Sequence, residues 1–317
     1  PTTVEPFNGA ATGTGGEIRD RMGGGVGSWP IAGTAVYMTA YPRLQDENGK
    51  MPALRDWEDI LPVREWLYQT PQQILTKASN GASDFGNKFG QPLIAGSVLT
   101  FDLQENGEKY AYDKVVMLAG GVGYGAKRDC LKKTPQPGNK VVVVGGDNYR
   151  IGLGGGSVSS VDTGRYSSGI ELNAIQRANP EMQKRAYNLV RALVEEDENP
   201  VVSIHDHGSA GHLNCLSELV EDCGGRIDMD KLPIGDKTLS AKEIIANESQ
   251  ERMGLLIDEK YLDHVRRIAE LERAPMYVVG ETTGDAHFSF VQKDGVKPFD
   301  LDVAQMFGHS PKTIMKD

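Results

Sequence analysis

The sequence has few cysteines and no long apolar run. Its three cysteines are Cys130, Cys215 and Cys223, and no two of them form a Cys-x-x-Cys pair. So few thiols, odd in number, are typical of a protein kept reduced, so we expect structural cysteines and a cytoplasmic location. None lies in a glycine-flanked turn, which argues against thiol chemistry. No run of roughly 18 apolar residues is present, which argues against a membrane span.

Basic residues are also fewer than acidic residues. Lys and Arg number 34 against 44 Asp and Glu, which gives a net charge of −10. Such a chain repels polyanions, so we exclude general binding to nucleic acid or to an anionic membrane surface. A local basic pocket for a small phosphate ester stays compatible with this charge. The hydrophobic content of 39% and the charged content of 25% are those of a globular protein.

A polar segment divides the chain into two parts. Residues 132–140 contain two prolines, one glycine and three lysines, which predicts a linker. The 317 residues suit two domains, so we expect residues 1–137 and 138–317 to form one each. Helical and extended patterns mix without a strict βαβ rhythm, which predicts an α+β (mixed α/β) fold class.

Hydrophobic periodicity predicts the elements of both parts. The expected strands are residues 34–41, 93–101, 110–119, 141–144, 201–204, 253–257, 276–279 and 287–291. The expected helices are residues 71–79, 180–196 and 258–273, with a further helix that Ser209 caps. Residues 1–33 are rich in glycine, and we expect loops there.

One segment near the N-terminus combines residue types that bind phosphate and metal. It reads Gly9-Ala-Ala-Thr-Gly-Thr-Gly-Gly-Glu-Ile-Arg-Asp20. Glycines let backbone N–H groups approach an anion, arginine binds phosphate or carboxylate, and aspartate can hold Mg²⁺. The segment fits neither a dinucleotide-binding fingerprint nor a Walker A loop. We interpret it as an anion-binding loop, and the alternative is a surface glycine loop with a stray salt bridge.

Three further segments carry candidate ligands. Residues 145–157 are glycine-rich and follow a buried strand, which suits either a second anion cradle or a tight crossover. Asp206 follows the strand 201–204 at its carboxyl end, where it could bind a hard cation or cap a helix. His205 and His207 share one face of that strand, a spacing that zinc can use, but no clear further ligand follows. Residues 247–252 are polar, and they suit either a polar ligand or an exposed loop.

Taken in order, these segments resemble the phosphoribosylformylglycinamidine synthase family of purine biosynthesis in its long, single-chain form. Residues 79–90, 117–123, 151–156 and 175–182 also match the family, so the likeness covers nearly the whole chain. It implies one N-terminal-type and one C-terminal-type domain of the aminoimidazole-ribonucleotide-synthetase-like superfamily. A sister enzyme of that superfamily, such as aminoimidazole ribonucleotide synthetase or a small-molecule kinase, is one alternative. A non-catalytic nucleotide-binding scaffold is the other.

The resemblance implies an ATP-dependent ligase with ATP and Mg²⁺ as cofactors. In this family ATP phosphorylates the formamide oxygen of formylglycinamide ribonucleotide, and ammonia derived from glutamine then displaces the phosphate. Asp20 and Asp206 match Mg²⁺ ligands. Substrate contacts are implied for Arg19, Gln176, Glu248, Ser249 and Gln250. The anion-binding loop is then the ATP or phosphate site, with Gly9, Ala10, Ala11, Thr12, Gly13, Thr14, Gly15 and Gly16.

Parts of the family pattern would lie outside this sequence. The family's Glu-Thr-His-Asn segment, with its catalytic histidine, would end at Pro1. The glutaminase domain and the second, pseudo-symmetric half would also be missing. We therefore expect no catalytic residue within this sequence and no ligase turnover by it alone. Domains of this type commonly pair their sheets, so we expect a homodimer.

Overall fold

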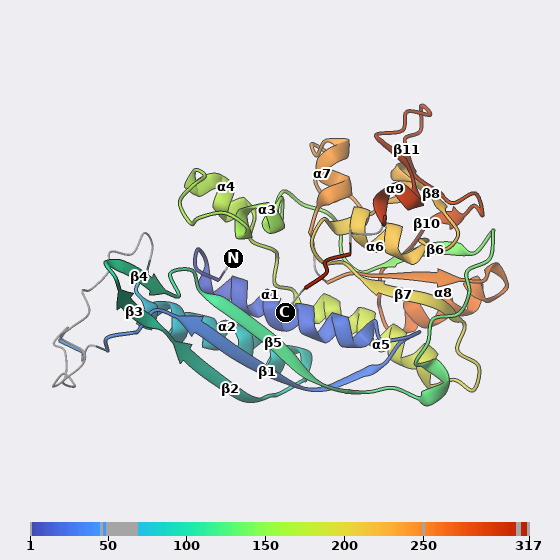
Figure 1. Cartoon of the computed structure of the whole chain (residues 1–317). Helices are drawn as coiled ribbons and strands as arrows, with labels where there is room; N and C mark the ends of the chain where they lie inside the picture. The colour runs from blue at the N-terminus through green and yellow to red at the C-terminus, as the bar shows by residue number, and fades with distance from the viewer. Residues whose placement is uncertain (1, 45–46, 49–68, 249–250, 309–311, 316–317) are drawn as a thin grey trace.

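The computed structural model describes residues 2–44, 47–48, 69–248, 251–308 and 312–315, and two sheets dominate it (Figure 1). A three-stranded sheet has the order β2-β1-β5, and a seven-stranded sheet has the order β12-β11-β8-β10-β6-β9-β7. Strands β3 and β4 form a separate hairpin. Both larger sheets mix parallel and antiparallel neighbours, and helices cover them, so the expected α+β fold class is confirmed.

The described helices and strands have the following bounds. The helices are α1 (Pro6–Met22), α2 (Pro71–Phe89), α3 (Gly155–Ser159), α4 (Ser168–Asn173), α5 (Pro180–Glu195), α6 (Gly211–Leu219), α7 (Ala241–Ala246), α8 (Leu262–Leu271) and α9 (Val303–Met306). The strands are β1 (Trp29–Thr39), β2 (Leu93–Thr100), β3 (Asp102–Glu105), β4 (Glu108–Ala111), β5 (Val116–Tyr124), β6 (Lys140–Val144), β7 (Val201–Asp206), β8 (Gly225–Asp228), β9 (Met253–Ile257), β10 (Met276–Thr282), β11 (His287–Val291) and β12 (Phe299–Asp302).

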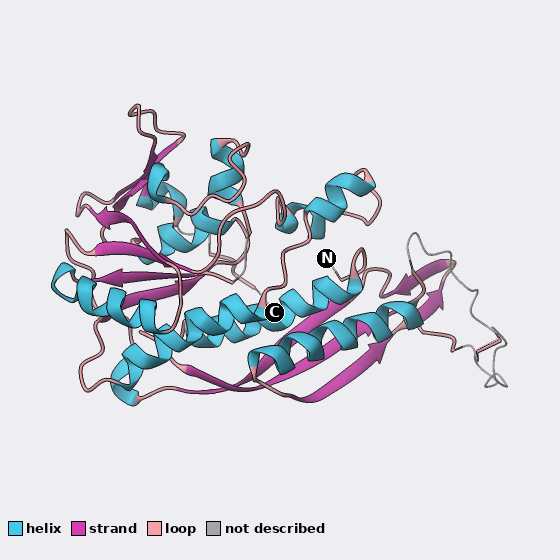
Figure 2. Ribbon diagram, turned by 180° about the vertical axis from the view of Figure 1, so that it is seen from behind, coloured by secondary structure: helices cyan, strands magenta, loops and turns pink. Residues whose placement is uncertain are grey.

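Helices α1 and α2 cover one face of the three-stranded sheet (Figure 2). Tyr37 of β1 faces these helices, since its hydroxyl donates to Ala78 O of α2 at 3.2 Å. Side chains alternate along a strand, so the neighbours of Tyr37 face the other way. That face, here called the outer face, carries four exposed aliphatic side chains. They are Leu99, Val116, Leu118 and Val122.

The seven-stranded sheet is buried on both faces. Val141 and Val143 of β6 point into one hydrophobic cluster, and Val142 and Val144 point into another. Helices α6, α7 and α9 cover the first face, and α5 and α8 cover the second. The run of four valines reads as a continuous apolar stretch because such a strand has no solvent face.

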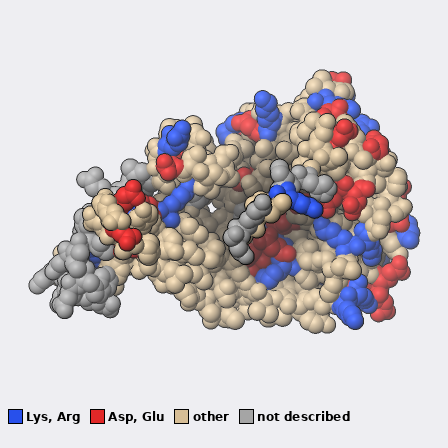
Figure 3. Space-filling model, in the orientation of Figure 1, with Lys and Arg blue, Asp and Glu red and all other residues tan. Residues whose placement is uncertain are grey.

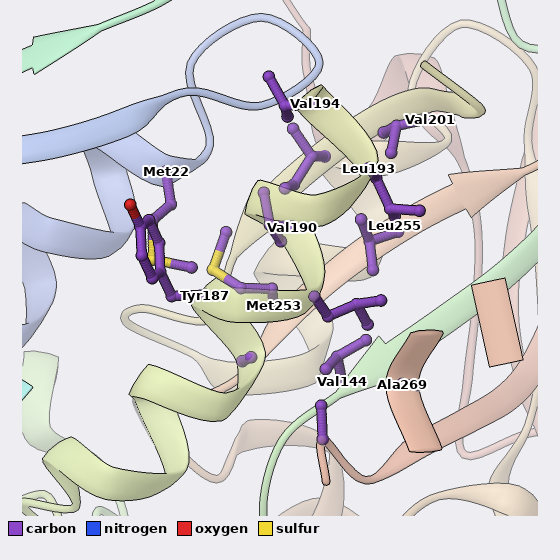
Figure 4. Close-up of a cluster of buried hydrophobic side chains, with 14 of the residues drawn as sticks. Met22, Val144, Tyr187, Val190, Leu193, Val194, Val201, Met253, Leu255 and Ala269 are labelled. Atoms are coloured by element: carbon purple, nitrogen blue, oxygen red, sulfur yellow. The ribbon is translucent and has the colours of Figure 1, made fainter. Parts of the chain in front are cut away.

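One hydrophobic cluster joins the two halves of the molecule (Figure 4). Met22 of α1 lies with Tyr187 and Val190 of α5 and with Met253 of β9, and all four are buried. The two sheets lie on either side of residue 137, but this cluster contains residues from both sides. The domain boundary at residues 137 and 138 therefore stays a prediction.

The main correction concerns residues 6–22, which form helix α1 and not the expected glycine loop. Glycine weakens an isolated helix, but burial against the core stabilises this one: Ile18 and Met22 are fully buried. The glycines allow close packing, since a Cβ on Gly15 would lie 2.8 Å from Phe85 Cζ. Two smaller expectations were also wrong. Residues 110–119 divide into parts of β4 and β5, and Ala210, not Ser209, is the N-cap of α6.

Candidate functional site

A cavity of about 420 Å³ lies between α1, β5 and the first loops of the second half. Figure 3 shows the same side of the molecule hollowed between the two halves. Helix α1 contributes a row of mostly small residues to the wall, and Gln176, Ser209 and Glu248 come from the other side. The remaining lining residues are Thr2, Gly9, Thr12, Gly13, Gly16, Glu17, Asp20, Met117, Ala119, Gly155, Gly156, Ser159 and Ala174.

The predicted anion loop is instead one face of a helix. Gly9, Thr12, Gly13 and Gly16 recur at three- and four-residue spacing, so they line the cavity together. Their backbone N–H groups lie within α1, where intrahelical carbonyls accept them, so the expected cradle of free N–H groups is wrong. The residues between them, Ala10, Ala11, Thr14 and Gly15, are buried away from the cavity. The small residues leave room where larger side chains would fill it.

Asp20 and Asp206 lie together beside the guanidinium of Arg19. Arg19 Nε lies 3.9 Å from Asp206 Oδ2. Burial and the neighbouring Asp206 raise the pKa of Asp20. Burial opposes ionisation of Asp206 as well, but its hydrogen bond with His205 and the charge of Arg19 lower its pKa. Sequence reasoning placed these two carboxyl groups in one site, and the structure brings them together.

Arg19 itself is buried and does not line the cavity. Its Nη1 donates to Gln183 Oε1 at 2.8 Å, and Gln183 Nε2 donates to Gly15 O at 3.0 Å. These two bonds tie α1 to α5. The structure thus shows Arg19 as a support behind the site.

The two histidines considered for zinc have different partners. His205 Nε2 pairs with Glu218, whereas His207 Nε2 lies 2.9 Å from His212 Nδ1. In the part of the chain that the structure describes, no group of three or more His, Cys, Asp or Glu side chains could hold a metal ion. A zinc site at His205 and His207 therefore has no support.

Glu248 connects three segments at the cavity wall. Its Oε2 accepts from Gln176 Nε2 at 2.7 Å, and its Oε1 accepts from the N–H groups of Gly156 at 3.3 Å and Ala210 at 3.2 Å. A Cβ on Gly155 would lie 2.4 Å from Glu248 Oε2. These contacts favour a tight crossover over a second anion cradle for residues 145–157. Ser249 and Gln250, predicted beside Glu248, lie outside the described residues.

Sequence reasoning missed Glu17. This buried residue of α1 lines the cavity, and its Oε1 accepts from Gln91 Nε2 at 2.7 Å while its Oε2 pairs with Arg21. Burial raises the pKa of Glu17 from 4.5 to about 6. The signal was its three-residue spacing from Asp20, which places both on one face only if the segment is a helix.

Comparison with known proteins now places the chain in a family. Residues 136–293 match the family described as "AIR synthase related protein, C-terminal domain". These residues, about half of the chain, belong to the AIR synthase related family. This membership agrees with the superfamily that the sequence motifs implied, and the seven-stranded sheet lies mostly within the matched residues.

Two curated relatives of this AIR synthase related chain carry the same name. Phosphoribosylformylglycinamidine synthase of Dictyostelium discoideum is 39% identical over 327 residues, which cover 100% of the chain and 23% of that protein. The enzyme of Homo sapiens is 40% identical over 294 residues, which cover 92% and 22%. The chain thus spans less than a quarter of the length of these relatives. The resemblance found in the sequence is confirmed.

Solved structures share the fold. "T. maritima PurL complexed with FGAR" matches with a TM-score of 0.72 and 25% identity, over 100% of this chain and 45% of that one. "T. maritima PurL complexed with ATP" matches with a TM-score of 0.67 and 23% identity.

The location of the chain stays a prediction. None of the helices in the described ranges is both long enough and apolar enough to cross a membrane. The cytoplasmic location expected from the sequence is not settled by the relatives, since one from Arabidopsis thaliana, 36% identical, is named "chloroplastic/mitochondrial".

Proposed function

We propose that the chain provides a substrate-binding part of an ATP-dependent phosphoribosylformylglycinamidine synthase. That enzyme converts formylglycinamide ribonucleotide, ATP and glutamine-derived ammonia into formylglycinamidine ribonucleotide. The observation that carries the proposal is the cavity in which α1 meets Gln176 and Glu248. The similarity of the whole chain to 45% of the chain in "T. maritima PurL complexed with FGAR" supports it.

The cavity suits a polar ligand of moderate size. Its volume of about 420 Å³ lies within the usual range for small-molecule sites. Gln176 offers an amide, Glu248 a carboxylate, and Thr12 and Ser209 hydroxyl groups, which suit the hydroxyl and amide groups of a ribonucleotide. Within this proposal Arg19 supports α1 from behind the site. Ser249 and Gln250 join the cavity residues as substrate contacts, and no residue is assigned to catalysis.

Mg²⁺ and ATP belong to the same proposal. Two carboxyl groups, those of Asp20 and Asp206, fit Mg²⁺, which proteins commonly bind through one or two carboxylates together with phosphate oxygens. When bound, Mg²⁺ would neutralise negative charge on the phosphates of ATP. The hydrogen bond with His205 and the charge of Arg19 lower the pKa of Asp206, which favours the carboxylate, and the small face of α1, from Gly9 to Gly16, leaves room for a phosphate group.

A binding experiment tests the proposal without turnover. Isothermal titration of the chain with formylglycinamide ribonucleotide should show saturable binding. Gln176→Ala removes a cavity amide and should weaken binding about tenfold, the effect of one hydrogen bond of roughly 1.4 kcal/mol. Lys231→Gln is the matched control, because Lys231 is exposed and pairs with Asp228 away from the cavity. Absence of saturable binding by the unaltered chain would reject the substrate, and binding of ATP alone would favour a nucleotide-binding scaffold.

We also propose that the outer face of the three-stranded sheet pairs with a second copy of the chain. Val122 on this face is 58% exposed, and Leu99, Val116 and Leu118 extend the apolar patch beside it. Contiguous apolar patches of this kind mark protein interfaces. Light scattering should show a dimer that Val122→Lys dissociates. A stable monomer of the unaltered chain at high concentration would reject the pairing.

A further inference from the structure

The side chain of Arg252 bonds back to Asn247, the residue next to Glu248. The guanidinium is fully buried, and its Nη2 donates to Asn247 O at 3.0 Å, so the side chain of Arg252 spans its own segment. Its Nη1 donates to Asn148 Oδ1 and, at 3.1 Å, meets His212 Nε2. The two ends of residues 247–252 are thereby held together and fixed against the loop after β6.

The turn at the start of α6 contacts this segment at three consecutive residues. The N–H of Ala210 donates to Glu248 Oε1 at 3.2 Å. Gly211 lies against Asn247, since a Cβ there would be 2.0 Å from Asn247 O, and its φ of 57° favours glycine. His212 meets Arg252. The turn therefore contacts Asn247, Glu248 and Arg252.

The buried hydrogen bonds fix which nitrogen of each histidine carries the proton. A guanidinium only donates, so His212 Nε2 must accept from Arg252. In a neutral ring the proton of His212 then sits on Nδ1, which donates to His207 Nε2 at 2.9 Å. The proton of His207 sits in turn on Nδ1, a buried atom with no hydrogen-bond partner among the described residues.

Both rings are neutral in this arrangement. Burial, followed by the charge of Arg252, lowers the pKa of His212 well below its usual range, and the same two causes do so for His207. The rings cross edge-to-face with centroids 4.9 Å apart. A neutral His212 can offer a lone pair to Arg252, whereas a protonated ring could not.

We propose that His212 is a positioning residue for Glu248. Its Nε2 lone pair orients Arg252, Arg252 holds the carbonyl of Asn247, and Asn247 places the adjoining Glu248 in the cavity wall. This inference rests on the proposed function, because Glu248 is a substrate contact there. Nothing in the sequence marks His212 for this role, since Arg252 lies 40 residues away along the chain.

Three variants of His212 separate positioning from simple packing. His212→Phe keeps a ring but removes both nitrogen atoms. His212→Gln places an amide near the position of Nε2 and so keeps an acceptor for Arg252, whereas His212→Asn places it near Nδ1. The Phe and Asn variants should weaken binding of formylglycinamide ribonucleotide about tenfold, the loss of one hydrogen bond to a charged group, and the Gln variant should retain it.

A second readout does not depend on the ligand. Hydrogen exchange of the amides of Asn247, Glu248 and Arg252 should be faster in the Phe and Asn variants and unchanged in the Gln variant. Imidazole nitrogen-15 spectra of the unaltered chain should show His212 protonated at Nδ1. If the Phe variant does not fold, the Gln and Asn pair still carries the comparison.

The outcomes distinguish the two proposals. Faster exchange in the Phe and Asn variants, together with no ribonucleotide binding by the unaltered chain, would support positioning and reject the substrate. Equal exchange and equal affinity in the Gln and Asn variants would overturn the positioning role, as would a His212 protonated at Nε2.

Discussion

Gly81 lies where the two helices that cover the three-stranded sheet approach each other closely. A Cβ at this position of α2 would lie 2.0 Å from the backbone oxygen of Phe7 in α1. A Cβ atom essentially never lies closer than 3.0 Å to such a heavy atom, so the helices of a Gly81→Ala variant must separate by roughly 1 Å. The atoms that the new Cβ would meet belong to the backbone of Phe7, so movement of a side chain cannot remove the clash.

The size of the effect follows from two opposing terms. Within a helix, alanine is more favourable than glycine by about 1 kcal/mol. Overpacking a well-packed contact costs about 1–3 kcal/mol, and here the shift also loosens the fully buried Ala10, Ala78 and Ala82. The two terms together leave a net cost of about 0–2 kcal/mol, and because the buried alanines also lose contact we expect Gly81→Ala to lower the free energy of unfolding by the upper part of this range, about 1–2 kcal/mol. Because α1 lines the cavity, ribonucleotide binding should weaken as well.

Urea unfolding measures this change, and Gly169→Ala is the matched control. Gly169 lies in α4 with nothing within 4 Å of a built Cβ, so that variant should be as stable as the unaltered chain or slightly more so. The midpoint should fall in Gly81→Ala at an unchanged slope. A Gly81→Ala variant as stable as the Gly169→Ala control would refute the packing argument.

Three other predictions follow from single groups. Burial raises the pKa of Glu17 to about 6, so the folded state favours the protonated carboxyl group. The free energy of unfolding should therefore rise by up to about 2 kcal/mol as the pH falls from above 6 to 4.5. Urea unfolding measures this rise, and the Glu17→Gln variant should lack it. Cys130 is exposed, so a disulfide reagent should modify it in the native protein, while the two buried cysteines should react only after unfolding; fast reaction of a second thiol would contradict this. Lys114→Met removes two hydrogen bonds from Lys114 Nζ to carbonyls of residues 159–161, so hydrogen exchange there should be faster, and unchanged exchange would count against the contact.

Strands were predictable because their signal is local. The valine run 141–144 became β6, and residues 253–257 became β9, each at the expected place. Both are apolar over a short length, which a buried strand requires and a helix of that length does not favour. The hairpin of β3 and β4 was missed because its residues are mostly polar and exposed.

Helix α1 was unpredictable from local preference. Its four glycines disfavour a helix, and its stabilisation comes from contacts with residues such as Phe85 and Tyr187, far away along the chain. Glu17 was missed because we expected a loop in this segment, and a loop gives no fixed spacing that would place Glu17 and Asp20 on one face. Residue types nevertheless pointed to Asp20 and Asp206, because carboxylates near glycines and at a strand end are informative without any fold.

The order and type of the residues were enough to identify the family, the fold class and the residue types that meet in the site. The order of the motifs and the apolar periodicity can be read directly from the amino-acid sequence. The three-dimensional structure was needed to show that residues 6–22 form a helix, that Arg19 supports the site from behind, and that His212 contacts Arg252. Each of these depends on contacts between distant segments, and burial at such contacts outweighs local conformational preference.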